Sequence, residues 1–179
     1  MSIYKYYNAY LSLFKHRLLN RGEFVKKTYV ISIILALATG ILSALLTSGN
    51  MNLYDEIITP ALAPPSILFP IVWTVLYVLM GISAAMIFGS TSVPANQRAE
   101  ALFSYFVSLV VNFFWSIIFF NMQMYFFAFI WLVLLWVLIL KTILEYRQIN
   151  KIAAYLQIPY LVWVTFAGYL TFSIFLLNR

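Results

Sequence analysis

Residues 60–77 read Pro-Ala-Leu-Ala-Pro-Pro-Ser-Ile-Leu-Phe-Pro-Ile-Val-Trp-Thr-Val-Leu-Tyr, and this stretch decides the fold. Pro60, Pro64 and Pro65 fix φ and remove three backbone donors, so its first half cannot lie inside a helix. Residues 67–88 are almost wholly apolar and numerous enough to cross a bilayer as a helix. The stretch therefore predicts a stiff loop that leads directly into a membrane helix.

Two aromatic residues on that helix indicate a possible binding surface. Trp73 and Tyr77 are four residues apart, so they share one helix face below the proline-rich loop. A rigid loop over an aromatic face suits a flat apolar ligand, whereas a loop that merely turns the chain fits the same spacing. The pattern alone leaves both interpretations open.

The composition places the chain in a membrane. Of its 179 residues, 64% are hydrophobic and 9% are charged, whereas soluble domains carry about 25% charged residues. The length suits one compact domain. The sequence contains no cysteine, which excludes disulfides, thiolate catalysis and cysteine metal sites.

The apolar stretches predict an all-α integral membrane protein, a bundle of five transmembrane helices. Residues 101–140 are nearly uninterrupted apolar positions, which as one helix would be about 60 Å long, twice the thickness of the bilayer core. The chain must turn back there, and the polar break at residues 121–123 is the expected place. The predicted spans are about 28–47, 67–88, 102–120, 125–144 and 152–177.

Residues 1–27 are predicted to form a basic amphipathic extension. They carry six Lys and Arg residues against one acid, Glu23. Apolar residues recur at helical spacing, which is typical of a short helix at a membrane surface: Ile3, Tyr7, Tyr10, Phe14 and Leu18. Nucleic-acid binding is the competing interpretation of a basic arm, and the aromatic face beside a bilayer favours the membrane.

The distribution of basic residues predicts the orientation. Five spans gather ten Lys and Arg residues on the side of the N-terminus and leave Arg179 alone on the other side. By the positive-inside rule, the N-terminus then lies in the cytoplasm and the C-terminus outside. We therefore expect a multi-pass protein of the plasma membrane whose proline-rich loop faces outward.

The predicted spans offer little reactive chemistry. They contain no deeply placed ionisable residue, which argues against proton-coupled transport. His16 falls on the polar face of the extension, and no metal-binding cluster or activated nucleophile is recognisable. Asn112 and Ser116 share one face of the third span, where the amide needs a partner, either another helix or a ligand. Any ligand would be bound through shape, stacking and hydrogen bonds.

Four groups of residues match one known family in order and spacing over about residues 50–178. The groups are Pro60-x3-Pro64-Pro65, Val72-Trp73-x3-Tyr77 with Gly81, Asn112-x2-Trp115 with Phe119-Phe120, and Pro159-Tyr160-x2-Trp163-x2-Phe166-Ala167. With them the chain resembles the translocator protein family, also called tryptophan-rich sensory proteins (TspO/MBR). Residues 1–27 lie outside the resemblance.

The resemblance implies a five-helix bundle, often a homodimer, with a pocket under the first loop. It implies binding of porphyrins and haem-like tetrapyrroles, in some members also cholesterol and synthetic ligands, with no cofactor or metal required. Carried over by motif position, the ligand-binding residues are Tyr54, Trp73, Tyr77, Asn112, Trp115, Ser116, Trp163 and Ala167. The implied function is a membrane receptor for tetrapyrroles. The alternatives are transport and light-dependent porphyrin degradation, in which Trp73 and Trp163 would be the catalytic residues.

Three departures from the family pattern stand out. Leu53 stands where many relatives have tryptophan. Trp131 stands where an acidic residue is common, which is expected to remove a polar anchor. Phe172 and Leu176 stand where a sterol-recognition pattern would have tyrosine and a basic residue, which lowers the expectation of cholesterol binding.

Two small residues predict where a homodimer would form. Ser104 and Ser108 are four residues apart in the third span, a spacing that lets two helices approach closely. We therefore expect a dimer to use that helix.

The charge distribution yields a test of topology. A C-terminal reporter that is active only in the cytoplasm should stay silent, because five spans place Arg179 outside. The same reporter fused within the polar link at residues 145–151 should be active. Activity of the C-terminal fusion would exclude the five-span orientation.

Overall fold

The computed structural model describes the backbone of residues 3–50 and 56–179, and the side chains from Gly22 onward within those ranges. Its elements are α1 (Ile3–Thr47), η1 (Ser48–Asn50), α3 (Leu68–Phe88), α4 (Ala95–Ser116), a π-helical turn η2 (Ile117–Asn121), α5 (Tyr125–Ile149) and α6 (Lys151–Leu177). Five helices in the described ranges are long and apolar enough to cross a membrane. The chain is a multi-pass integral membrane protein, as predicted.

The turn predicted in the middle of the long apolar stretch is confirmed. η2 ends at Asn121 and α5 begins at Tyr125, so the reversal lies within residues 122–124. Gln123 has a φ of 53°, a left-handed conformation that is uncommon outside glycine and helps to reverse the chain over so few residues.

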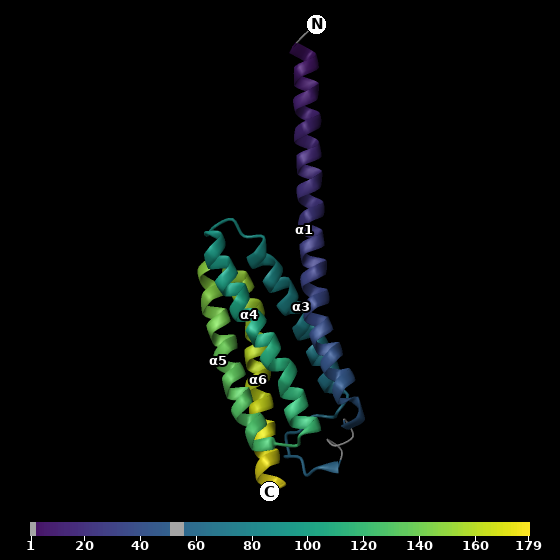
Figure 1. Cartoon of the computed structure of the whole chain (residues 1–179), viewed down its shortest axis with the longest axis vertical. Helices are drawn as coiled ribbons and strands as arrows, with labels where there is room; N and C mark the ends of the chain where they lie inside the picture. The colour runs from purple at the N-terminus through teal and green to yellow at the C-terminus, as the bar shows by residue number, and fades with distance from the viewer. Residues whose placement is uncertain (1–2, 51–55) are drawn as a thin grey trace.

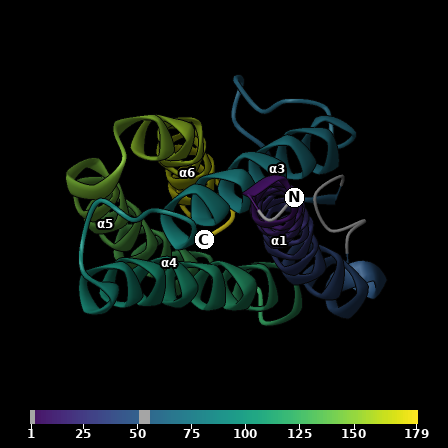
Figure 2. The ribbon, with the colours of Figure 1, turned by 90° about the horizontal axis from the view of Figure 1, so that it is seen from above.

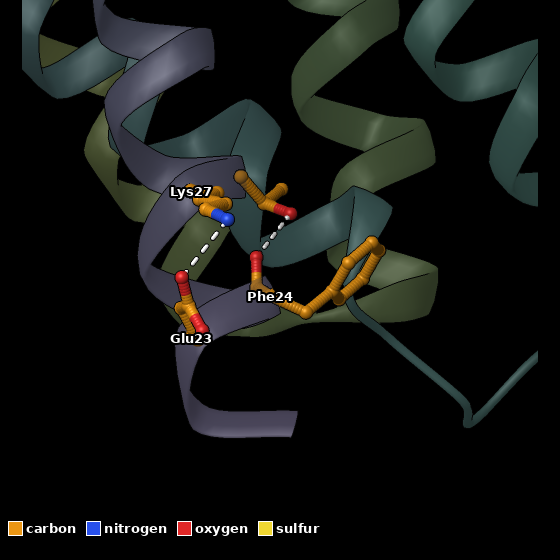
Figure 3. A network of polar contacts seen from close by, with 4 residues as sticks. Glu23, Phe24 and Lys27 are labelled. Carbon is orange, nitrogen blue, oxygen red and sulfur yellow. Dashed lines mark hydrogen bonds and ion pairs between the residues drawn. The ribbon is translucent and has the colours of Figure 1, made fainter. Parts of the chain in front are cut away.

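α1 continues through the predicted boundary at residue 27. The sequence predicts a short separate helix before the first span, whereas the structure has one uninterrupted helix over Ile3–Thr47 that projects past the other helices (Figure 1). Further along α1, Lys27 pairs with Glu23 at 2.9 Å, and the Thr28 hydroxyl donates to the Phe24 carbonyl at 3.0 Å (Figure 3). Contact of the extension with the membrane surface stays a prediction.

The five helices form a ring. α3 packs against both α1 and α6, α5 packs against both α6 and α4, and α4 returns to α1 (Figure 2). One end of the ring, called the loop end, holds residues 56–67, the turn at residues 122–124 and the C-terminus (Figure 1). The other end, called the far end, holds the α3–α4 and α5–α6 links, and α1 projects from it. The two termini therefore lie at opposite ends, as an odd number of spans requires.

Two glycines let α1 and α3 approach closely. A Cβ on Gly81 of α3 would lie 2.5 Å from the Cα of Ile33 in α1. A Cβ on Gly40 of α1 would overlap the ring of Tyr77 in α3. Gly40, Ser43 and Ala44 of α1 are small, a pattern that indicates close helix packing, and α3 is the helix that Gly40 approaches.

The predicted dimer contact through Ser104 and Ser108 is wrong. Both residues face the interior of their own bundle and are 3% and 1% exposed. The Ser108 hydroxyl donates to the Tyr105 carbonyl of the same helix at 2.7 Å. Residues four apart share a helix face, but their spacing does not tell which neighbour that face meets. A homodimer would have to use other residues.

Gly81→Ala should destabilise the protein, because the added methyl group would collide with the Ile33 backbone and overpacking typically costs about 1–3 kcal/mol. The matched control is Gly168→Ala in α6, where a Cβ meets nothing within 4 Å and alanine gains roughly 1 kcal/mol of helix propensity. The melting temperature in detergent should fall for the first variant and stay or rise for the second. Equal melting temperatures would contradict the close approach of α1 and α3.

Candidate functional site

A cavity of about 550 Å³ lies inside the ring toward the loop end. Its walls come from α1, α3, α4, η2 and α6, and residues 66–67 of the loop border it. Cavities of this size are typical of sites for small molecules. α5 supplies none of the described lining residues and packs behind α4 and α6.

Most of the predicted site residues meet at this cavity. Six of them line it: Trp73, Tyr77, Asn112, Trp115, Ser116 and Ala167. They come from α3, α4 and α6, so motifs that are far apart in the sequence converge in space. Tyr54 lies outside the described residues, and Trp163 takes a different position.

α3 supplies an aromatic wall. Pro70 lies in its first turn, where the missing N–H removes no helical hydrogen bond. Trp73 follows about one turn later, and its ring stacks on Tyr77 with centroids 5.6 Å apart. The predicted shared face of these two residues is therefore confirmed, and both rings border the cavity.

Asn112 supplies an amide to the cavity. Its Nδ2 donates to the Tyr77 hydroxyl at 2.8 Å, which joins α4 to α3. Its Oδ1 is buried without a hydrogen-bond partner among the described residues, as is Nε1 of Trp115. Both residues line the cavity. One side chain therefore serves as a helix contact and also keeps an acceptor free, and Trp115 adds a free donor.

The described lining is uncharged. Its polar groups are hydroxyls, the amide of Asn112 and the indole N–H groups of Trp73 and Trp115, and no Lys, Arg, Asp, Glu or His belongs to it. An ionised group buried there would lack a counter-charge, which is costly in an apolar environment. The cavity thus suits a mainly apolar molecule with neutral hydrogen-bonding groups.

Trp163 packs behind the cavity wall. The motif position predicts contact with the ligand, whereas Trp163 is not among the residues that line the cavity. Its ring meets Trp73 edge-on with centroids 6.5 Å apart, and it meets Phe69 at 5.9 Å. Tyr160 also meets Trp73 edge-on, at 6.1 Å. Trp163 therefore supports the ring that faces the cavity.

α1 and η2 contribute residues that the motifs did not assign to the site. Gly40, Ser43 and Thr47 line the cavity from α1, and Phe119 lines it from η2. The Ser43 hydroxyl donates to the Phe113 carbonyl at 3.4 Å, which holds α1 against α4. The available signal was the series of small residues in α1, although that pattern indicates close packing and not a cavity. π-helical turns such as η2 are frequent at functional sites.

Trp131 provides a polar anchor of its own. The resemblance predicts that replacement of an acidic residue by Trp131 removes a polar anchor at this position, and the indole N–H supplies a different polar contact. The Trp131 Nε1 donates to the Val111 carbonyl at 2.7 Å, which joins α5 to α4. Because Val111 precedes Asn112, this contact also holds the cavity wall from behind.

Asn178 fixes the loop that borders the cavity. The Ile58 N–H donates to Asn178 Oδ1 at 3.0 Å, and Asn178 Nδ2 donates to the Ile58 carbonyl at 2.9 Å. Asn178 caps α6, whose Ile174 lines the cavity. Elsewhere at the loop end, Asn121 Nδ2 donates to the Leu46 carbonyl at 3.0 Å and ties η2 to α1.

Comparison with known proteins establishes the family. The TspO/MBR family model matches residues 32–177. The chain belongs to the TspO/MBR family. It is 36% identical over 152 residues to the tryptophan-rich protein TspO of Chlorobaculum tepidum, which covers 84% of this chain and 96% of that relative. It is also 36% identical over 126 residues to protein CrtK of Rhodobacter capsulatus, which covers 70% of this chain and 78% of that relative. It is 28% identical over 141 residues to the translocator protein of Bos taurus, which covers 78% of this chain and 83% of that relative.

The match confirms the resemblance carried by the motifs. It begins at residue 32, so residues 1–27 lie outside it. All described residues that line the cavity fall within residues 32–177. The cavity is therefore built from the TspO/MBR part of the chain.

Asn178→Ala should loosen the loop of this TspO/MBR protein. The Ile58 amide loses its acceptor, so peptides covering residues 56–63 should exchange hydrogen for deuterium faster. Asn96→Ala, an exposed position at the far end in α4, is the control and should leave that exchange unchanged. Equal exchange in both variants would show that Asn178 does not hold the loop.

Proposed function

We propose that this TspO/MBR protein is a membrane receptor that binds porphyrins or related tetrapyrroles in the cavity beside the proline-rich loop. The observation that carries the proposal is an uncharged cavity of about 550 Å³ with the stacked rings of Trp73 and Tyr77 in its wall. A tetrapyrrole macrocycle is flat and mainly apolar, so it gains stacking and dispersion contacts on such a wall. The volume of the cavity also lies within the range that is typical of small-molecule sites.

The free polar atoms of the cavity match the nitrogens of a macrocycle. Both atoms are buried, so they would pair with a ligand only after a shift of their side chains. Asn112 Oδ1 could then accept from a pyrrole N–H, and Trp115 Nε1 could donate to an unprotonated ring nitrogen or a neutral side group. Each bond would also satisfy a buried group that is otherwise unpaired. Ionised carboxylates of the ligand would stay at the loop end, because the described lining holds no counter-charge.

A metal-free porphyrin suits the cavity better than haem. The described lining residues include no histidine, cysteine or methionine, which are the usual axial ligands of haem iron. The Tyr77 hydroxyl is engaged by Asn112. Haem would therefore bind through its ring and not through its metal.

We further propose that the protein lies in the plasma membrane with its N-terminus in the cytoplasm. Support comes from Arg98, Arg147 and Lys151, which belong to the helix ends at the far end, the end from which α1 projects. Cytoplasmic links of membrane proteins carry an excess of such residues.

Trp73→Leu should weaken porphyrin binding by about 1–2 kcal/mol, because the ligand loses a stacked ring and buried area. Trp163→Leu should weaken it less, since Trp163 acts through Trp73. The control is Trp136→Leu in α5, outside the described lining, whose Nε1 donates to the Thr165 hydroxyl at 2.9 Å. Titrations that follow the porphyrin absorption band measure each Kd. An equal loss in all three variants would contradict the proposed site.

A further inference from the structure

A second hollow, called the side groove, lies between α1 and α4 on the surface of the ring. Its volume is about 500 Å³. α4 lines one side of it over residues 102–114, and the other residues that line it come from α1 and α3: Ser32, Leu35, Thr39, Leu42, Ala84 and Phe88. None of the described residues that line the side groove also lines the ligand cavity. The side groove is therefore a separate feature of the bundle.

The side groove has an apolar floor and opens toward lipid. Ala84 and Leu109 form part of its floor and are 5% and 7% exposed, whereas Leu35 and Phe106 at its edges are 62% and 59% exposed. The Thr39 hydroxyl donates to the Leu35 carbonyl of its own helix at 3.1 Å. This hydroxyl is therefore already paired, and the groove offers a mainly apolar surface to the bilayer.

The length of the side groove matches one leaflet of a bilayer. On the side of the loop end, the Ser43 hydroxyl donates to the Phe113 carbonyl, so α1 and α4 meet there and the groove ends. From Leu102 to Phe114 it follows α4 for twelve residues, which is about 18 Å along a helix. Half of a bilayer core is about 15 Å thick. A single acyl chain that enters from the far end would therefore extend along the groove.

Arg98 lies at the mouth of the side groove at the far end. It precedes the groove residue Leu102 by four positions, so it shares that face of α4 about 6 Å farther on. Its guanidinium donates to the carbonyl of Ser90, two residues past the groove residue Phe88 of α3. Arg98 therefore stands where both walls end. No carboxylate among the described residues forms an ion pair with it.

The charge at the mouth gives the side groove a preference for one kind of lipid. In a bilayer an acyl chain gains little by exchanging lipid neighbours for apolar helix surfaces, so the groove alone does not select a headgroup. A guanidinium has five N–H donors and matches the geometry of phosphate, and Arg98 uses only part of this set on Ser90. Basic sites between membrane helices bind anionic headgroups. A zwitterionic headgroup carries its own cation beside the phosphate, which weakens the attraction to arginine.

We propose that the side groove binds an acyl chain of an anionic phospholipid, whose headgroup is held by Arg98 at the far end. α3 ends at Phe88 and the apolar part of α4 begins near Ala101, so Arg98 lies beyond the apolar spans, at the depth of headgroups. The proposal goes beyond tetrapyrrole binding, because it uses a different surface and holds whatever ligand the cavity takes.

Native mass spectrometry of the purified full chain, titrated with lipids in detergent, tests the proposal. The wild type should bind phosphatidylglycerol more tightly than phosphatidylcholine with the same acyl chains. Arg98→Gln should lower the affinity for phosphatidylglycerol roughly fivefold, the effect expected of one basic residue beside an anionic surface, and leave that for phosphatidylcholine unchanged. Arg147→Gln, at an exposed position in the last turn of α5, is the matched control and should change neither. Equal affinities of the wild type for both lipids, or equal losses in both variants, would overturn the proposal.

Ser32→Phe tests the side groove itself. The added ring would fill part of the groove, so binding of both lipids should weaken. Ser173→Phe in α6, which lines neither the groove nor the ligand cavity, is the control and should leave lipid binding unchanged. Porphyrin affinity should stay the same in both variants, which separates this proposal from the proposed function. Unchanged lipid binding in Ser32→Phe would overturn the proposal, as would the loss of a lipid-free dimer, because a second copy of the chain would then occupy the groove.

Discussion

The side chain of Tyr77 joins three helices, and the cavity depends on this junction. Its ring occupies the space that Gly40 leaves open on α1, and it stacks on Trp73 within α3. Its hydroxyl accepts from Asn112 of α4 at 2.8 Å. In lipid, apolar helix surfaces gain little by leaving the bilayer to contact each other. Close packing and hydrogen bonds therefore have to hold the ring of helices together. Tyr77 therefore sets the spacing of α1, α3 and α4 at the depth of the cavity.

The same junction keeps the polar atoms of the cavity in place. Once the Asn112 nitrogen is bound to Tyr77, its oxygen is held in a fixed position. Trp115 lies three residues further on the same helix and is fixed by its ring contact with Phe119 at 5.5 Å. Both atoms are buried, so a ligand would have to shift these side chains to use them, which costs part of the binding free energy.

The order of the helices could be predicted from the sequence, whereas their rotation could not. Length and polarity suffice to place the turn near Asn121, and helical spacing suffices to put Trp73 and Tyr77 on one face. In a soluble helix the apolar stripe marks the buried side, but here the side that faces lipid is apolar as well. Ser108 therefore gave no sign that it points inward, and Trp163 gave none that it stands behind Trp73. The charge of residues 1–27 predicts a surface segment, yet no proline breaks the helix there, and α1 continues.

The proline-rich loop and the ring of helices differ in how firmly they are held. Tyr77 and Asn112 are buried, so opening their contact would leave polar groups unpaired inside the bundle. The Ile58–Asn178 hydrogen bonds are exposed, and water can replace them at a cost of about 1 kcal/mol each. Three prolines between residues 60 and 65 restrict the backbone of the loop, so it would move as a stiff piece. The aromatic wall is therefore held more firmly than the loop beside it, because breaking its buried contacts costs more than breaking the exposed ones.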